Sequence, residues 1–297
     1  MPVLPITMKV IIESRWSADE HDRALDRLAA RENFPVAARL LPGRHRAALK
    51  AVYGFARLVD DIGDEAPPEQ RAKLLGLVDD DLDRVFAGRT PSLPQLRRLA
   101  GTVHANRLPA EPFRDLVRAN RQDQVVHRYE TFTEVTEYCA LSAAPVGRIV
   151  LHLFRAHRPA LVAASDDVCT ALQLIEHCQD AGEDYRNGRI YLPGEDLRRF
   201  GCAEDDLARP VTPTRLRGVL ALEAGRAADL LDRGAAPLMA GLTGWARFAV
   251  AGYVAGGRAA LAALARGRYD VLAHPPRPRR AGVLARWARA AGKGGTK

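Results

Sequence analysis

The sequence has few of the features that mark several common protein classes. Aromatic residues make up only 6% of the 297 residues, and because no recognition motif occurs, nucleic acid is not an expected partner. The four cysteines show no CxxC spacing, which predicts buried thiols in a reducing compartment. No GxGxxG or P-loop signature is present, so a mononucleotide or Rossmann site has no support.

Long, clean apolar segments are also scarce. The N-terminal segment MPVLPITMKVIIESRW has Lys9 inside its apolar run and no small-residue cleavage site, so it is not typical of a signal peptide. The most apolar window, residues 235–257, contains Arg247 and several glycines. It falls short of the roughly 20 clean residues that a spanning helix requires. We therefore predict a cytoplasmic protein, either soluble or peripheral at the inner face of the cell membrane.

The composition favours helices instead. Apolar residues make up 47% of the chain, Ala, Leu and Arg fill long stretches, and strictly alternating runs of β-branched residues are absent. We predict a single all-α domain over residues 17–274, with an N-terminal extension at 1–16 and a basic tail at 275–297. The formal net charge of +8 should attract anions, and diphosphates or anionic lipid surfaces fit better than nucleic acid.

Capping boxes, prolines and glycines set the expected helix ends. Pro145 should kink or break one of these helices. In the tail, Val283, Leu284 and Trp287 predict an apolar face for an anionic bilayer, with a solvated tail as an equal alternative. The expected helices span 17–31, 35–42, 44–63, 69–86, 95–105, 111–128, 131–156, 165 into the second acidic motif, 212–233 and 244–267.

Two acidic motifs break the local rules of helix composition in the same way. DDIGDE (60–65) and QLIEHCQDAGED (173–184) each place carboxylates one helical turn apart, a spacing that costs about 0.2 to 0.5 kcal/mol per like-charged pair. Both motifs precede helix-ending residues, where the helix dipole also disfavours acids. A divalent cation between two facing acidic helices would remove both penalties, and Mg²⁺ leaves positions for substrate phosphate oxygens. For DDIGDE alone, a solvated helix end is the commoner explanation.

The motifs define a set of candidate residues. Tyr53 and Arg57 precede Asp60 and Asp64 on one helix face, as in a cavity lining, and the guanidinium groups of Arg57 and Arg189 match phosphate geometry. His177 and Cys178 lack further ligands at zinc spacing, so we interpret both as packing residues. The candidate metal ligands are Asp60, Asp61, Asp64, Glu176, Asp180 and Asp184.

Four segments together resemble the squalene and phytoene synthase family across residues 31–272: RENFPVAARLLP, AVYGFARLVDDIGDE, YCALSAAPVG and QDAGEDYRNGRIYLPGEDLRRFG. The resemblance implies a terpenoid synthase helical bundle around a central cavity, Mg²⁺ as cofactor and an isoprenoid diphosphate as substrate. ENFPVA, PVG and EHCQD are most similar to bacterial hydroxysqualene synthases of hopanoid pathways. Other enzymes of such a pathway are therefore expected partners.

The resemblance also assigns roles. Asp60 with Asp64 and Asp180 with Asp184 match the two metal motifs, whereas Arg57 and Gln173 match diphosphate-site positions. Glu176 stands where relatives commonly have Asn, which leaves the number of metal ions open. Leu141, a candidate substrate contact, stands where many relatives have a Tyr tied to the first condensation.

This departure at Leu141 favours an enzyme that starts from presqualene diphosphate and adds water. Two alternatives stay open. One is condensation of prenyl diphosphates to presqualene diphosphate, squalene or phytoene. The other is a non-catalytic relative that acts as an assembly factor.

Overall fold

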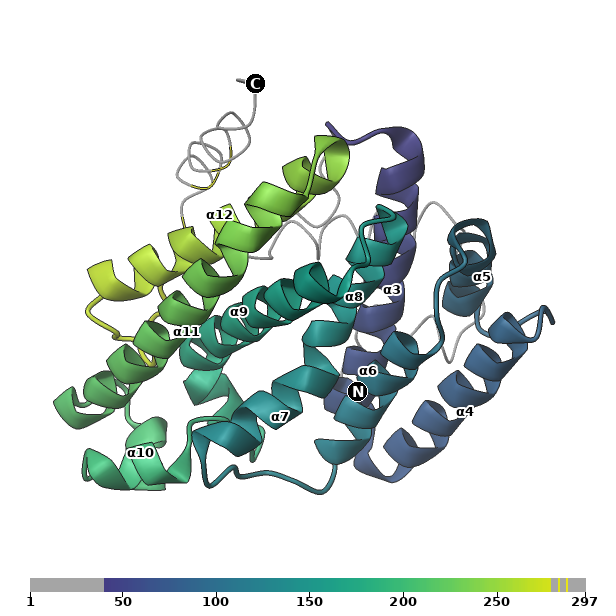
Figure 1. Ribbon diagram of the computed structural model, residues 1–297. Coiled ribbons are helices and arrows are strands. Elements are labelled where there is room, and N and C mark those ends of the chain that lie inside the picture. Colours follow the sequence, from purple (N-terminus) through teal and green to yellow (C-terminus); the bar gives the residue numbers. More distant parts are fainter. Residues whose placement is uncertain (1–39, 279–282, 284–286, 288–297) are drawn as a thin grey trace. The chain divides into compact units, whose positions relative to one another are not determined.

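The computed structural model describes residues 40–278 together with Val283 and Trp287. All regular elements within these residues are helices, and an isolated bridge joins Arg128 to Ile190 (Figure 1). The prediction of an all-α fold is therefore confirmed. The expected extension at 1–16 and the expected helices at 17–31 and 35–42 lie outside the described residues.

Internal contacts divide the chain into two compact units, residues 1–125 and 126–297. The first contains α3 (Gly43–Glu65), α4 (Pro68–Phe86), α5 (Pro94–Asn106) and α6 (Glu111–Gln122). The second contains α7 (Phe132–Ser142), α8 (Ala144–Leu153), α9 (Pro159–Arg186), α10 (Gly194–Arg199), the 3₁₀ helix η1 (Glu204–Ala208), α11 (Thr214–Gly241) and α12 (Gly244–Arg266). The domain boundaries at 17 and 274 stay a prediction.

Helix α3 is the centre of the first unit, where it packs against α4, α5 and α6. Its buried stripe includes Phe55 and Leu58, both fully buried. The ring of Phe55 meets that of Phe113 from α6 edge to face, with centroids 5.3 Å apart. Burial of each such side chain stabilises the unit by roughly 1.5 to 3 kcal/mol, so this face fixes the rotation of α3 and sets where its acids lie.

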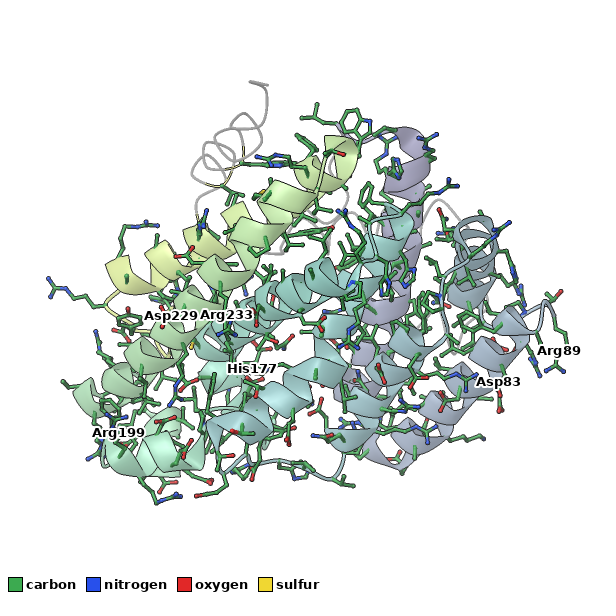
Figure 2. All side chains as sticks on the ribbon, in the orientation of Figure 1. Asp83, Arg89, His177, Arg199, Asp229 and Arg233 are labelled. Atoms are coloured by element: carbon green, nitrogen blue, oxygen red, sulfur yellow. The ribbon has the colours of Figure 1, made fainter. Side chains whose placement is uncertain are left out.

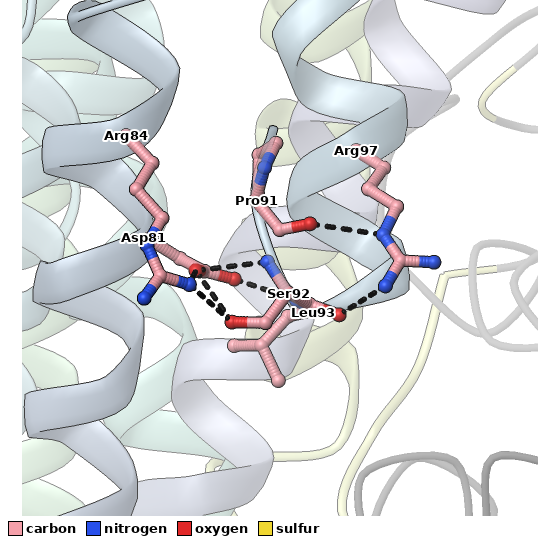
Figure 3. A network of polar contacts seen from close by, with 6 residues as sticks. All are labelled: Asp81, Arg84, Pro91, Ser92, Leu93 and Arg97. Carbon is pink, nitrogen blue, oxygen red and sulfur yellow. Dashed lines mark hydrogen bonds and ion pairs between the residues drawn. The ribbon is translucent and has the colours of Figure 1, made fainter. Parts of the chain in front are cut away.

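A buried aspartate anchors the connection between α4 and α5 (Figure 3). Asp81 is 0% exposed and accepts hydrogen bonds from the backbone N–H groups of Ser92 and Leu93 at 2.9 and 2.5 Å. It also accepts from the Ser92 hydroxyl at 2.7 Å and from Arg84 at 3.0 Å. Burial opposes ionisation, yet these donors hold the pKa of Asp81 below its usual value. Asp81 therefore supplies the N-terminal acceptor that α5 lacks locally.

Helices α9 and α11 form the centre of the second unit, and α12 packs against both. Their backbones approach closely at Gly234, where an added Cβ would lie 2.3 Å from the Ala164 carbonyl oxygen. Helix α11 continues to Gly241 although Pro237 lies inside it, so the predicted end at 233 was wrong. Burial of Ala235 and Leu238 offsets the hydrogen bond that the proline removes.

The helix expected over residues 131–156 is broken, as Pro145 predicted. Helix α7 ends at Ser142, and Pro145 lies in the first turn of α8, where its missing N–H costs nothing. At the start of α7 the Thr131 hydroxyl accepts from the Glu134 N–H at 3.2 Å. The Glu134 carboxylate accepts from the N–H of Glu130 rather than from that of Thr131, so half of the predicted capping box forms.

Two other expected helix ends were wrong. Helix α6 ends at Gln122, because residues 127–130 are extended and pair with the chain after α9, as in the 3.0 Å bond from Ile190 N to His127 O. Helix α9 begins at Pro159, so Ser165 is a buried interior residue and not its cap. Both errors arose where tertiary contacts and a first-turn proline overrode local capping signals.

Helix α12 is long and apolar enough to cross a membrane by length and composition, contrary to the expectation from window 235–257. However, 67% of its apolar segment is buried inside the structure, as in the core helix of a globular protein. This is weak evidence for a membrane span. The cytoplasmic location stays a prediction.

Two residues of the predicted tail, Pro276 and Trp287, contact the helices α9 and α12. Gln179 of α9 donates to the Pro276 carbonyl at 2.7 Å. The Trp287 indole N–H donates to the Phe248 carbonyl at 2.8 Å, and the two rings lie 4.6 Å apart. Trp287 is 7% exposed, so it is not available to the bilayer face proposed for it, and Leu284 lies outside the described residues.

A buried charge cluster joins α10 to α11. Arg226 lies 2.5 Å from the Asp196 carboxylate and 2.6 Å from that of Glu223, and its guanidinium covers the Phe132 ring at 4.3 Å. Two acids share one cation here. Burial and the like charge of Asp196, against the opposing effect of Arg226, together raise the pKa of Glu223 to about 7.

This raised pKa predicts a pH-dependent stability. In the unfolded chain Glu223 loses its proton at about pH 4.3, whereas in the fold it keeps the proton to about pH 7. Its contribution to stability is therefore full below pH 4 and is lost as the pH rises through 7. We expect Glu223→Gln to gain in melting temperature relative to wild type between pH 5 and pH 8. An unchanged difference would contradict this, and exposed Glu137→Gln is the control.

Candidate active site

The last two turns of α3 carry the first acidic motif. Asp60 and Asp64 are exposed on this unit, whereas Asp61 is 2% exposed and its carboxylate lies 2.6 Å from Arg57 Nε. Arg57 also approaches Glu65 at 3.4 Å. The helix thus offers two open carboxylates one turn apart, while Asp61 neutralises Arg57 instead of adding a third.

Asp60 is oriented by a residue that the sequence did not single out. Asn120 of α6 donates from Nδ2 to Asp60 Oδ1 at 3.1 Å. Gly63 makes room for this contact, because a Cβ on that residue would lie 2.2 Å from Asn120 Oδ1. A polar residue on the buried face of α6 was the available signal, and it is visible only once the helix faces are known.

The end of α3 receives positive charge from α4. Arg71 donates to the carbonyl oxygens of Ala66 and Asp64 at 2.8 and 2.9 Å, and to Gln124 Oε1 at 3.2 Å. Gln124 in turn donates to the Gly63 carbonyl at 3.2 Å. These bonds satisfy the carbonyls at the negative end of the helix dipole. They offset part of the cost of placing acids there.

The pKa of Asp60 reflects the groups around its carboxylate. Although the carboxylate stays open to solvent, crowding by protein atoms and, to a lesser extent, the like charge of Asp64 raise its pKa to about 7. The hydrogen bond from Asn120 and the charge of Arg57 oppose the rise. A carboxylate that is repelled by a neighbouring carboxylate is a favourable cation ligand, because a bound cation offsets the repulsion directly.

Substitution of Gly63 tests the Asn120 contact. Gly63→Ala forces Asn120 to shift inside a packed interface, so we expect the free energy of unfolding to fall by about 1 to 3 kcal/mol in urea denaturation. Gly76→Ala on α4 is the matched control, since a Cβ there meets nothing within 4 Å. It should raise stability by roughly 0.5 to 1 kcal/mol. Equal effects of the two changes would contradict the assignment.

The second acidic motif occupies one side of α9. Gln173, Glu176, Asp180 and Asp184 are all partly exposed, whereas Leu174, Ile175 and Cys178 between them are buried. The helix ends at Arg186, and Gly188 at φ +83° makes the turn that follows. The predicted row of acids near a helix end is therefore present.

His177, whose side chain is labelled in Figure 2, follows Gln173 by four residues and so lies on the same side of α9, but it is buried. Its ring stacks on Tyr191 with centroids 4.2 Å apart and planes 8° apart. Burial and, to a lesser extent, the charge of Arg189 lower the pKa of His177 to about 3. The imidazole is thus neutral at any physiological pH, in agreement with the prediction of a packing residue.

The remaining candidates have different environments. Tyr53 on α3 and Leu141 in the last turn of α7 are partly exposed. Arg189 is 8% exposed, and its backbone N–H donates to the Asp184 carbonyl at 2.9 Å. The α3 candidates lie on the first unit and the others on the second. That the two acidic rows face each other stays a prediction.

The donor set fits Mg²⁺ better than a protein-enclosed metal. No three Asp, Glu, His or Cys side chains of the described part of the chain converge as a metal site. Mg²⁺ commonly takes one or two protein carboxylates and completes its octahedron with water and substrate phosphates. Open carboxylates one turn apart, such as Asp60 with Asp64, can serve that purpose.

Comparison with known proteins agrees with this set of features. The squalene/phytoene synthase family model matches residues 28–287. The chain belongs to this family, whose members process prenyl diphosphates.

Several individual proteins are similar to this chain over most of its length. The hydroxysqualene synthase of Sinorhizobium fredii is 35% identical over 71% of this chain and 72% of its own length. The phytoene synthase of Cereibacter sphaeroides is 36% identical over 63% of this chain and 55% of its own. The crystal structure of squalene synthase HpnC from Alicyclobacillus acidocaldarius is 38% identical. It matches with a TM-score of 0.74 over 84% of this chain and 95% of that one.

Proposed function

We propose that the protein converts presqualene diphosphate and water into hydroxysqualene and diphosphate, with Mg²⁺ as its cofactor. The observation that carries the proposal is that both acidic rows are intact: open Asp60 and Asp64 on α3, and the partly exposed row on α9. The similarity to hydroxysqualene synthases supports the choice of reaction. Leu141, which stands where many relatives have Tyr, favours a substrate that has already been condensed.

The residues divide the work in the proposed reaction. Bound Mg²⁺ supplies positive charge that stabilises diphosphate as a leaving group. Asp60 and Asp64 would hold the metal from α3, and Asp180 and Asp184 from α9, with Glu176 as a further ligand. Tyr53, Arg57, Gln173, Arg189 and Leu141 would contact the substrate.

The proposed chemistry balances without a reductant. The carbon–oxygen bond to diphosphate breaks, its electron pair leaves with the diphosphate, and a cyclopropylcarbinyl cation remains. An apolar pocket must hold this cation while it rearranges. A water oxygen then bonds to the product cation and releases one proton, which yields hydroxysqualene.

A product assay separates this function from its alternatives. Purified protein is incubated with Mg²⁺ and either presqualene diphosphate or farnesyl diphosphate, without NADPH. The lipid product is then identified by mass spectrometry. We expect hydroxysqualene from presqualene diphosphate, and loss of turnover in EDTA that added Mg²⁺ restores. Consumption of farnesyl diphosphate alone would establish the condensing activity instead. No turnover of either, or of geranylgeranyl diphosphate, would favour the assembly factor.

A further inference from the structure

His177 shares the side of α9 that carries the acidic row. It follows Gln173 by four residues and precedes Asp180 by three, so the three side chains are neighbours along the helix. His177 is nonetheless 5% exposed and is not itself open to a substrate. His177 can therefore affect the reaction only by positioning a neighbouring side chain that is open to the substrate.

The imidazole is held in one orientation by a stack of aromatic rings. Tyr191 lies parallel to it at 4.2 Å, and Tyr191 stacks in turn on Tyr138 at 5.3 Å and on Tyr129 at 5.8 Å. The backbone fixes this stack as well, since the Gly194 N–H donates to the Tyr129 carbonyl at 2.9 Å. The His177 ring therefore cannot turn without displacing residues from three segments of the unit.

One nitrogen of the ring faces Gln173. His177 Nε2 lies 3.1 Å from Gln173 Nε2, while buried His177 Nδ1 has no hydrogen-bond partner. An amide nitrogen can only donate, so in this arrangement the imidazole accepts at Nε2 and carries its proton at Nδ1. The amide oxygen Oε1 of Gln173 then points away from the ring. Retaining an unsatisfied buried nitrogen is costly, and such groups occur at functional sites.

We propose that His177 is a positioning residue that holds the Gln173 amide so that its carbonyl oxygen is presented along the acidic row. A carbonyl oxygen accepts hydrogen bonds and cannot donate to a diphosphate oxygen. Gln173 would accordingly accept a hydrogen bond from a water molecule, either metal-bound or reacting, while the second hydrogen of its amide nitrogen stays available to a diphosphate oxygen. This inference rests on the proposed function, because it places Gln173 in the reaction site.

A double-mutant cycle tests the coupling. His177→Phe keeps a ring against Tyr191 but removes the acceptor, and we expect kcat to fall about tenfold with little change in KM and melting temperature. His177→Gln returns an acceptor near the position of Nε2 and should recover most of kcat. In a Gln173→Leu background, His177→Phe should have no further effect. Independent, multiplying losses would overturn the positioning role.

The tautomer of His177 provides a test that does not require turnover. Long-range ¹H–¹⁵N spectra of ¹⁵N-histidine-labelled protein should show the proton on Nδ1. A proton on Nε2 would mean that His177 donates to the Gln173 oxygen, which overturns the proposed orientation. If wild type consumes no prenyl diphosphate, the proposed function fails, whereas the spectra still decide the orientation of Gln173.

Discussion

Replacing Asp60 and Asp64 together by asparagine is expected to reduce turnover by roughly a thousandfold or more. The two side chains are exposed carboxylates one turn apart on α3, and asparagine keeps their size while removing both negative charges. A cation held there would lose most of its attraction, and departure of the diphosphate would lose its charge compensation. Turnover of the prenyl diphosphate that wild type consumes, measured with circular dichroism of the same samples, checks this result.

The control variant removes the same number of negative charges at other positions of the same unit. Glu69→Gln combined with Asp80→Asn removes two exposed acids from α4 and should leave turnover within about twofold, since surface charges contribute little. If the Asp60 and Asp64 variant kept more than a tenth of wild-type turnover, the metal assignment for α3 would be wrong. The equivalent change of Asp180 and Asp184 tests the α9 row in the same way.

A second large effect is expected at Asp81. Asp81→Ala leaves the N–H groups of Ser92 and Leu93 and the guanidinium of Arg84 without their shared acceptor in a buried position. Hydrogen bonds to a charged group are worth about 1.5 to 3 kcal/mol, and unpaired buried donors add a penalty. We expect the free energy of unfolding to fall by about 3 kcal/mol in urea denaturation.

Asp83→Ala is the matched control, because Asp83 lies on the same helix as Asp81 and forms an exposed ion pair with Arg114 of α6 at 2.8 Å. Its loss should cost less than about 1 kcal/mol. Similar losses for Asp81→Ala and Asp83→Ala would show that the α4–α5 connection does not depend on the buried acceptor.

The sequence predicted the features that depend on local pattern. Within each acidic row the carboxylates lie one turn apart near a helix end, because the helical period sets the spacing and the residues that follow, such as Gly188, set the helix end. The break before Pro145 followed from the missing N–H in the same way. The resemblance of the motifs predicted membership of the squalene and phytoene synthase family, and the match to the family model confirmed it.

Features that depend on tertiary contacts were missed. Asn120 reaches Asp60 only because Gly63 on another helix lacks a side chain, and no local pattern links those two positions. Arg71 was likewise indistinguishable from a surface arginine until its three oxygen partners were known. The start of α9 was misplaced because Ser165 has the residue type of a cap but lies inside a helix that tertiary packing extends.

The contact of Trp287 with Phe248 bears on how shortened versions of this protein would behave. A chain ended at residue 274 would match the predicted domain boundary, yet it would leave the Phe248 ring uncovered and its carbonyl without the indole donor. Bare aromatic rings on a surface promote self-association. Versions trimmed there should aggregate sooner on concentration than the full chain, so crystallisation and storage are best served by keeping the residues through Trp287.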